Sequence, residues 1–223
     1  PVWRTPHWRT PASRSGSDEQ AAWVGVARVV DAMLEVPIAP SFTRIGFEAR
    51  HRLFHWRDVG SYDLEGRVIV VTGATSGLGR AAAEQFARNG ATVVAVGRDR
   101  DRTAHAVGEM RELAGNPDVS AVIADMGDYD SVRRAADELL AQHDRLDVLI
   151  HNAGALTHQR IDAPDGTEAT VASQVVGPFL LTSLLLGALE ASAPARVITV
   201  SSGGMYTAEL TVDGLEMDAT SYN

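Results

Sequence analysis

Three glycines, Gly73, Gly77 and Gly79, stand between a short apolar run at 68–71 and a helical pattern that opens near residue 79. This order predicts a strand, a glycine turn and a helix N-terminus. Without Cβ atoms the turn lets the backbone approach a pyrophosphate, and the helix end supplies unpaired N–H groups and a positive dipole end. The segment therefore predicts a dinucleotide site. We expect its contacts to come from Thr72, Gly73, Thr75, Ser76, Gly77, Leu78 and Gly79.

The residues after the next predicted strand, 91–96, favour one form of the dinucleotide. An acidic residue at this point would accept both ribose hydroxyls of NAD, but the sequence has Gly97 and Arg98. A guanidinium can pair with a 2′-phosphate in a fork geometry, so Arg98 favours NADP as the cofactor. Two alternatives leave NAD open: Arg98 stacks on the adenine, or it pairs with Asp99 or Asp101 on the surface.

Segments of strand and helix character alternate from residue 67 onward. Strands are expected at 68–71, 91–96, 119–124, 146–150 and 196–200, with helices at 79–89, 102–113, 129–142 and 168–190. This alternation predicts a parallel sheet with right-handed crossovers. The expected fold class is therefore α/β, a Rossmann-type doubly wound parallel sheet whose ligand lies at the carboxyl ends of the strands.

The residues before this domain fall into two parts. Residues 1–20 are rich in Arg, Thr, Pro and Ser without an apolar period, and we interpret them as a disordered or non-native leader. Residues 21–60 are interpreted as an amphipathic helical extension, with helical character at 21–36 and a second amphipathic segment at 42–56. One interpretation is a pair of helices that packs on the following domain. The other is peripheral membrane contact through 21–56, because aromatic and arginine side chains suit a headgroup region.

The composition narrows the class of protein. The 223 residues carry a formal net charge of -9, which argues against a nucleic-acid partner. All 20 lysine or arginine residues are arginines, and the absence of cysteine excludes disulfides and thiolate chemistry. The histidines lack metal-ligand spacing, so no metal is expected. No apolar run approaches the ~20 residues of a membrane span, and we expect a cytoplasmic protein.

Several motifs occur in a fixed order from about Leu64 to the end of the chain. After Thr72-Gly73-x-x-x-Gly77-x-Gly79 come Asp125-Met126, His151-Asn152-Ala153-Gly154 and Val200-Ser201-Ser202-Gly203, each at the end of a predicted strand. In this order they resemble the classical short-chain dehydrogenase/reductase family, and within it the retinol-dehydrogenase-like members. The resemblance implies that Asp125 contacts the adenine. It also places Met126, Asn152, Ala153 and Gly154 in the cofactor site.

The same resemblance implies an oxidoreductase. Members of the family transfer a hydride between a nicotinamide cofactor and an alcohol or carbonyl group, and the branch implies an apolar substrate. Ser202 corresponds to the catalytic serine, with Ser201 as a neighbouring candidate. Gln174 stands where the family has an asparagine that joins a proton relay, and Val175 beside it joins the expected cofactor contacts. Because Gln174 adds a methylene, we expect the relay to be shifted or completed by a water; otherwise Gln174 is an ordinary helix residue that faces a neighbour.

The chain departs from the family at the catalytic Tyr-x-x-x-Lys motif, because it has no lysine. Tyr206 is followed four places later by Leu210, and Tyr222 is next to last. We interpret 64–223 as a Rossmann NAD(P)-binding domain that is incomplete at its C-terminus, with further strands expected beyond Asn223. This chain alone is then expected to be inactive, and the complete protein to form a homodimer or tetramer. The alternatives are a non-catalytic NAD(P)-binding sensor and a membrane-associated binding protein.

Overall fold

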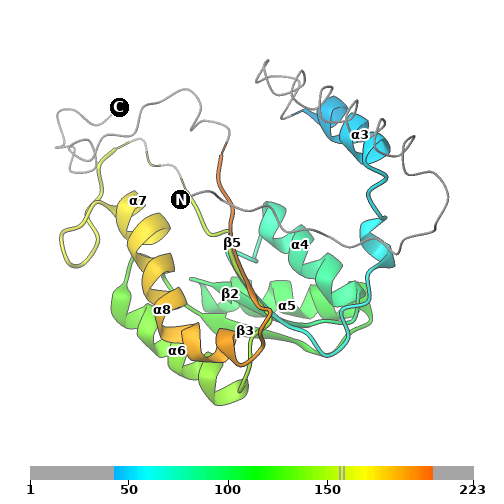
Figure 1. Ribbon diagram of the computed structural model, residues 1–223. Coiled ribbons are helices and arrows are strands. Elements are labelled where there is room, and N and C mark those ends of the chain that lie inside the picture. The colour runs from blue at the N-terminus through cyan, green and yellow to red at the C-terminus, as the bar shows by residue number, and fades with distance from the viewer. Residues whose placement is uncertain (1–42, 156, 158, 203–223) are drawn as a thin grey trace. The chain divides into compact units, whose positions relative to one another are not determined.

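The computed structural model describes residues 43–155, 157 and 159–202 (Figure 1). The chain divides between Arg57 and Asp58 into two units. The predicted leader, the predicted helix 21–36 and the two tyrosines of the C-terminal segment lie outside the described residues.

The described part of the first unit contains the helix α3 (Arg44–Leu53), which lies within the segment 42–56 that the sequence predicts to be amphipathic. Cations in a last turn suit the negative end of the helix dipole. Here they are Arg50 and Arg52. After the helix ends, the Trp56 ring meets the Phe47 ring edge-on, with centroids 5.7 Å apart. This aromatic contact folds the chain after α3 back onto the helix.

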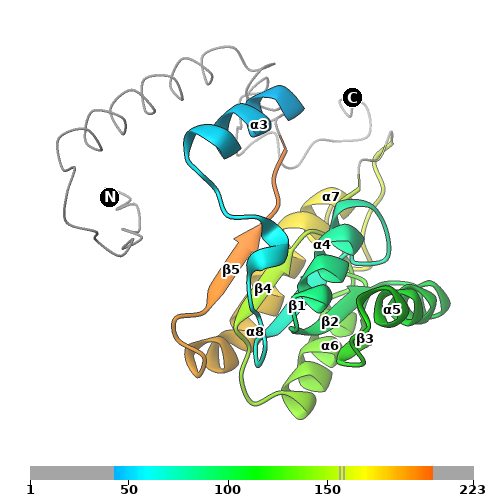
Figure 2. The ribbon, with the colours of Figure 1, turned by 90° about the vertical axis from the view of Figure 1, so that its right-hand side faces the viewer.

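The second unit contains a five-stranded sheet in which every pair of neighbouring strands is parallel (Figure 2). Its strands are β1 (Val68–Thr72), β2 (Thr92–Gly97), β3 (Val119–Ile123), β4 (Val148–His151) and β5 (Arg196–Thr199). Their spatial order is β3-β2-β1-β4-β5. The order runs outward from β1 in both directions, and such a switch point is where open parallel sheets bind ligands. The expected Rossmann-type fold is confirmed.

Helices cover both faces of this sheet (Figure 1). They are α4 (Gly77–Arg88), α5 (Arg100–Ala114), α6 (Tyr129–Gln142), the short α7 (Ala169–Val171) and α8 (Gly177–Glu190), with a 3-10 turn η1 (Val59–Ser61) and a π-helical turn η2 (Ala172–Val176). The helices α4 and α5 pack on one face, whereas α6 and α8 pack on the other. The layers therefore form an α/β/α sandwich.

Both faces of the central strands are buried, which explains their continuous apolar runs. In β1, Val70 belongs to the cluster formed with Leu139 of α6 and Leu185 of α8. Its neighbour Ile69 belongs to the opposite cluster, with Met110 of α5. Successive side chains on a strand point to opposite faces, so one short strand contributes to two hydrophobic cores.

Two helices begin earlier than the sequence predicts. The helix α4 begins at Gly77 rather than Gly79, and α5 begins at Arg100 rather than Arg102. In α5 the Asp99 carboxylate accepts a hydrogen bond from the backbone N–H of Arg102 at 2.9 Å. An N-cap of this kind starts a helix ahead of its first apolar residue, so apolar periodicity alone placed the boundary too late.

The predicted helix 168–190 is a helical stretch in three parts, α7, η2 and α8. Pro178 stands in the first turn of α8. It has no N–H to donate to the carbonyl four residues earlier, so the regular hydrogen-bond ladder is interrupted there. The wider turn η2 lies immediately before this interruption.

The expectation that no segment reaches the length of a membrane span is wrong. By length and composition, the 22 residues Ala169–Glu190 could cross a membrane. In this unit, however, Leu181 and Leu185 of the same stretch are buried in the core beside α6. An apolar helix of this length is thus also what the interior of a soluble domain requires.

A buried carboxylate ties β1 to β4 at the end of the sheet away from the glycine turn. Asp147, which precedes β4, is 3% exposed. It accepts hydrogen bonds from Arg67 Nη1 at 2.7 Å, from Arg145 Nη2 at 2.8 Å and from the Val68 N–H at 3.0 Å. Burial opposes the charged form, but these donors outweigh it, so the pKa of Asp147 lies below its ordinary value.

We predict that Asp147→Asn destabilises this domain by about 2 kcal/mol, because hydrogen bonds to a charged group are lost. The difference in unfolding free energy between the wild type and the variant should be present at neutral pH. It should decrease as the pH drops below the ordinary aspartate pKa of 3.8. Urea unfolding at neutral pH and at about pH 3 measures this. The matched control is Asp144→Asn, an exposed position, for which a change within ~0.5 kcal/mol is expected. Equal stabilities of the two variants would contradict the role of Asp147.

Candidate functional site

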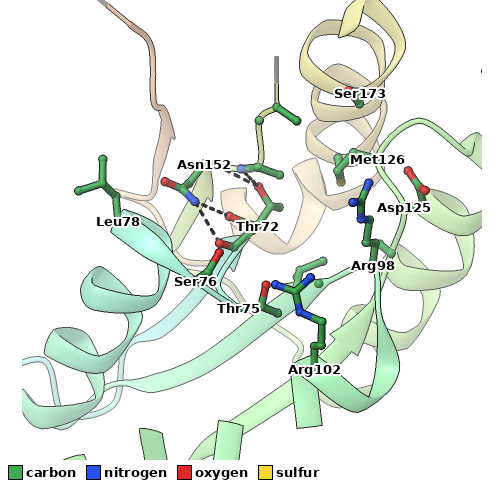
Figure 3. A pocket seen from close by; sticks show the side chains of 17 residues that line it. Thr72, Thr75, Ser76, Leu78, Arg98, Arg102, Asp125, Met126, Asn152 and Ser173 are labelled. Carbon is green, nitrogen blue, oxygen red and sulfur yellow. Dashed lines mark hydrogen bonds between the residues drawn. The ribbon is translucent and has the colours of Figure 1, made fainter. Parts of the chain in front are cut away.

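A cavity of about 440 Å³ lies at the carboxyl ends of β1, β2, β3 and β4 (Figure 3). Most residues that the sequence assigns to the cofactor site line it. They are Thr72, Gly73, Thr75, Ser76, Leu78, Arg98, Asp125, Met126, Asn152, Ala153 and Gly154. These residues follow four different strands, and the parallel topology gathers them at the same edge of the sheet.

The N-terminus of α4 lies beside this cavity. Its N-cap residue Ser76 makes no side-chain capping bond, and its first turn contains no acidic residue. By contrast, Asp99 caps α5 and Asp128 caps α6. The first turn of a helix has N–H groups without intrahelical partners. The start of α4 thus combines uncapped donors with the positive end of the dipole, which suits an anion.

Glycine is required at the turn because two stretches of backbone approach each other. Gly73 has a φ of +68°, and a Cβ there would lie 2.8 Å from Ala153 Cα. A Cβ at Gly79 would collide with the side-chain amide of Asn152 and with the carbonyl of Gly73. Gly77 has a φ of +57° with open space where its Cβ would stand. Gly73 and Gly79 therefore permit close packing of the two backbone segments, and Gly77 leaves room at the helix N-terminus.

Asn152 and Thr72 join the turn to the end of β4. The Asn152 side-chain amide donates to the carbonyls of Thr72 and Gly73 at 3.1 and 3.3 Å. The Thr72 hydroxyl accepts from the N–H groups of Asn152 and Ala153 at 3.0 and 3.1 Å. These bonds join residues 79 to 81 positions apart in the sequence. They fix the turn, so the Asn152 amide positions backbone as well as lining the cavity.

Two guanidinium groups line the cavity where β2 gives way to α5. Arg98 follows the strand and Arg102 lies in the first turn of the helix. Among residues 43–155, 157 and 159–202, neither forms a salt bridge. The surface pairing of Arg98 with Asp99 or Asp101 is therefore not seen in the described structure. Two cations without counterions leave the cavity suited to a negatively charged ligand.

Five of the assigned residues are not among those that line the cavity. They are Gly77, Gly79, Gln174, Val175 and Ser202. Val175 is 58% exposed, and Ser202 lies exposed beyond β5. Gln174 Nε2 donates to the carbonyl of Ala155 at 2.6 Å, so its amide faces the loop after β4. The roles assigned to Gln174, Val175 and Ser202 stay predictions.

Six residues that line the cavity are not among those that the sequence assigns to the cofactor site. They are Val96, Gly97, Arg102, Ala124, Ala155 and Ser173. The spacing of Arg102, four residues after Arg98 at the start of the next helix, was the available signal. Ser173 lies in η2, where the position of a side chain depends on the π-helical turn, and nothing in the sequence predicted that turn.

His151 occupies the first position of the motif that ends β4, and it is 5% exposed. Its Nε2 lies 2.8 Å from the Thr182 hydroxyl of α8. That hydroxyl donates to the Pro178 carbonyl, so we assign the imidazole proton to Nε2, which then donates to Thr182. Nδ1 is buried, with no hydrogen-bond partner in the described part of the chain. Burial lowers the pKa of His151 below its ordinary value of 6.5.

Comparisons with known proteins agree with this fold. The family model described as short chain dehydrogenase matches residues 67–210. Human dehydrogenase/reductase SDR family member 12 is 35% identical over 182 residues, covering 82% of this chain and 57% of the relative. Human retinol dehydrogenase 14 is 39% identical over 173 residues, covering 72% of this chain and 51% of the relative. The chain thus spans about half the length of these curated relatives.

The chain is also similar to solved structures of short-chain dehydrogenases and reductases. The Pseudomonas aeruginosa RhlG/NADP active-site complex is 32% identical with a TM-score of 0.54, covering 63% of this chain and 56% of that one. L-Sorbose reductase from Gluconobacter frateurii, complexed with NADPH and L-sorbose, is 28% identical with a TM-score of 0.55. There the coverage is 61% of this chain and 52% of the other.

A doubly wound parallel sheet with a glycine turn at its switch point defines the class of Rossmann-type proteins. Within that class this chain belongs to the short-chain dehydrogenase family. Its similarity to retinol dehydrogenases 13 and 14 places it in the classical, retinol-dehydrogenase-like branch. The resemblance read from the sequence motifs is confirmed.

We predict that this domain loses stability as pH falls below about 6.5, the ordinary histidine pKa. The unfolded chain then binds a proton that buried His151 does not, which favours unfolding until pH reaches the lowered pKa of the folded state. Thermal unfolding at about pH 7.5 and about pH 5.5 measures the loss. The variant His151→Asn should lose less stability than the wild type between these two pH values. His143, whose pKa is also lowered by burial, accounts for the remaining slope.

The matched control is His105→Asn, because the His105 side chain is 77% exposed. This variant should keep the full pH dependence of the wild type. If His151→Asn lost as much stability on acidification as the wild type and His105→Asn, His151 would not be the source.

Proposed function

We propose that this chain binds NADP(H) and forms the cofactor-binding part of an oxidoreductase that acts on an alcohol or carbonyl group. The observation that carries the proposal is the cavity itself. An uncapped helix N-terminus lies beside it, and it is lined by two guanidinium groups that form no salt bridge within the described residues. Two of the similar solved structures contain NADP or NADPH. NAD is the alternative cofactor.

The residues fit the cofactor chemically. The amides between Thr72 and Leu78 would hold the pyrophosphate, since glycine lets the phosphate oxygens approach the backbone. Asp125 and Met126 would contact the adenine, and Arg98 with Arg102 would hold the phosphorylated ribose. When bound, the cofactor supplies a hydride donor or acceptor at its nicotinamide ring.

The chain's own contribution to chemistry is proposed for Ser202 and Gln174. The Ser202 hydroxyl would hold the substrate oxygen by a hydrogen bond, at the end of β5 and hence at the same sheet edge as the cavity. The Gln174 amide would take part in a proton relay or position the loop to which it donates. An apolar substrate is favoured by the similarity to retinol dehydrogenase 14.

A non-catalytic NAD(P)-binding sensor is the second candidate, because the sequence contains no lysine and hence no Tyr-x-x-x-Lys pair. The oxidoreductase and the sensor would share the cofactor site, but only the oxidoreductase would turn over a substrate. In the family the lysine lowers the pKa of the tyrosine, which exchanges a proton with the substrate oxygen.

We also propose that the complete protein forms a homodimer or tetramer. The outward side of the stretch around α8 carries exposed apolar side chains within the described residues. They are Val175 of η2 and Phe179, Leu184 and Leu186 of α8, of which Phe179 is 73% exposed. Apolar side chains grouped on one helix suit burial against a second copy.

We further propose a cytoplasmic protein whose N-terminal unit touches a membrane surface. In α3, Ile45 and Phe47 are 77% and 53% exposed. The segment 44–57 has Arg44, Arg50, Arg52 and Arg57 against a single acid, Glu48. This basic, aromatic segment contrasts with the net charge of -9 of the whole chain, and anionic headgroups attract such segments.

We predict that Gly77→Val abolishes coenzyme binding, because its side chain would fill the open space at the start of α4. Isothermal titration with NADP⁺ and with NAD⁺ should show at least a ~100-fold loss of affinity for both. The matched control is Gly66→Val, since Gly66 also has a positive φ of +73° and open space around it but lies outside the cavity. Both variants carry similar backbone strain, of about 1–3 kcal/mol. Wild-type affinity in Gly77→Val would refute the pyrophosphate assignment.

We predict that the 223-residue chain binds coenzyme without turning over alcohols or aldehydes, because it contains no lysine to activate a catalytic tyrosine. Titration detects the binding, and the absorbance of reduced nicotinamide at saturating coenzyme detects turnover. The control for the assay is an active member of the same family. Steady turnover that scales with the concentration of this chain would overturn the prediction.

We predict that the chain sediments with vesicles that contain anionic phospholipid and remains in solution with neutral vesicles. The double substitution Ile45→Ser/Phe47→Ser should weaken sedimentation about tenfold, since two exposed apolar side chains are removed. Leu113→Ser serves as control, because Leu113 is a similarly exposed apolar residue at the end of α5. Equal sedimentation of the wild type, the double variant and Leu113→Ser would contradict the proposed membrane contact.

A further inference from the structure

The pair Asn89 and Gly90, at the C-terminal end of α4, has the residue types for a spontaneous backbone reaction. Asn89 is the C-cap residue of the helix, and Gly90 follows it with a φ of +90°. The backbone nitrogen of the next residue can attack an asparagine side chain, and glycine obstructs this attack least because it has no Cβ. In the whole sequence, Asn89 is the one asparagine that is followed by glycine.

We propose that Asn89 is a deamidation site whose reaction is controlled by the docking of the turn η1 and, once complete, ends that docking. In the reaction the Gly90 nitrogen forms a bond to Cγ of Asn89, and the bond from Cγ to Nδ2 breaks. Ammonia leaves with the proton of the Gly90 N–H, and a cyclic succinimide remains. Water then opens the succinimide to aspartate or isoaspartate, so the reaction needs water and no oxidant or reductant.

In the folded chain, hydrogen bonds occupy both reacting groups. Asn89 Nδ2 donates to the Val59 carbonyl at 2.7 Å, and Asn89 Oδ1 accepts from Gln85 Nε2 at 2.7 Å. The Gly90 N–H, which has to lose its proton, donates to the Ala87 carbonyl at 3.0 Å. The leaving group and the attacking group are thus both held by other partners. We therefore expect the reaction to proceed from molecules in which these bonds have opened.

The turn η1, to which the Asn89 side chain binds, is a part of the domain that opens at low cost. None of its residues is buried, and Val59 is 62% exposed. Asp58 caps the turn, because its carboxylate accepts a hydrogen bond from the Gly60 N–H at 2.7 Å. Segments with few buried contacts open locally without unfolding of the whole domain. The rate of deamidation should therefore report how often η1 leaves α4.

Conversion of the amide to a carboxylate would prevent the turn from docking again. A carboxylate at position 89 has no N–H to donate, so an oxygen would face the Val59 carbonyl where Nδ2 now lies. The new negative charge would also lie at the C-terminal end of α4, where the helix dipole opposes it. In addition, the Leu64 N–H donates to the Asn89 carbonyl at 2.8 Å, and isoaspartate would displace this carbonyl. One covalent change would thus release the segment that leads into β1.

The test follows the amide-to-acid conversion in the intact chain during incubation at neutral pH. Mass spectrometry of the tryptic peptide 89–98 measures it, and digestion in heavy-oxygen water identifies conversion that occurs during digestion. The folded wild type should convert at Asn89 more slowly than the same chain unfolded in urea. Asn116 is the control within the chain and should not convert by this route, because the nitrogen of Pro117 carries no proton.

A pair of variants tests the control by η1. Asp58→Ala removes the cap of the turn and should speed conversion at Asn89 about fivefold. The matched control is Asp128→Ala, which removes the same kind of cap from α6 and should leave the rate unchanged. Equal rates in the folded and the unfolded chain, or no acceleration in Asp58→Ala, would overturn the control by η1. The absence of conversion at Asn89 in all of these proteins would overturn the proposal as a whole.

The variant Asn89→Asp adds a readout of the release. Hydrogen exchange at the Leu64 amide should be about tenfold faster than in the wild type, because the docking bonds are lost. The matched control is Asn116→Asp. It makes the same change at a side chain that donates to the carbonyls of Ala87 and Ala91 but not to η1, and it should leave exchange at Leu64 unchanged. Wild-type exchange at Leu64 in Asn89→Asp would overturn the proposed release.

Discussion

The structure depends on the close approach of two backbone segments at the switch point of the sheet. Gly73 and Gly79 lie so near Asn152 and Ala153 that neither could carry a side chain without displacing them. Hydrogen bonds from the Asn152 amide and to the Thr72 hydroxyl hold the two segments together. This contact fixes where α4 begins, and the position of its uncapped N–H groups follows from it. The cavity is therefore a consequence of backbone packing, to which charged side chains are added.

The charges of the cavity oppose those of the chain. The protein carries a net charge of -9. Yet the cavity is lined by two guanidinium groups that form no salt bridge in the described part of the chain, and a positive helix end lies beside it. Carboxylates near this edge are used to cap α5 and α6, as Asp99 and Asp128 do. An acidic protein can in this way present a local positive potential to an anionic ligand. Salt screens charges that lie farther away than the Debye length, so the nearby groups determine the potential in the cavity.

The strand-turn-helix order predicted the sheet, its parallel direction and most of the cavity, because burial on both faces leaves continuous apolar runs that are easily recognised. Capping moved the start of α5 to Arg100, since a carboxylate can begin a helix before its apolar period does. Arg102 was overlooked because the helix was expected to begin there rather than at Arg100. Ser173 could not be placed, because its position depends on the π-helical turn before Pro178. The buried pairing of His151 with Thr182 joins residues 31 positions apart, which no local pattern reports.

The central claim is that the uncapped amides at the start of α4 bind the pyrophosphate of a dinucleotide. Backbone amide chemical shifts in a titration with NADP⁺ test it most directly, because each N–H group reports on its own environment. The largest saturable shifts should fall on the amides of residues 75 to 79, with smaller shifts at the start of the capped helix α6. Binding that left those amides unmoved, or shifts spread evenly over all helix starts, would contradict the claim.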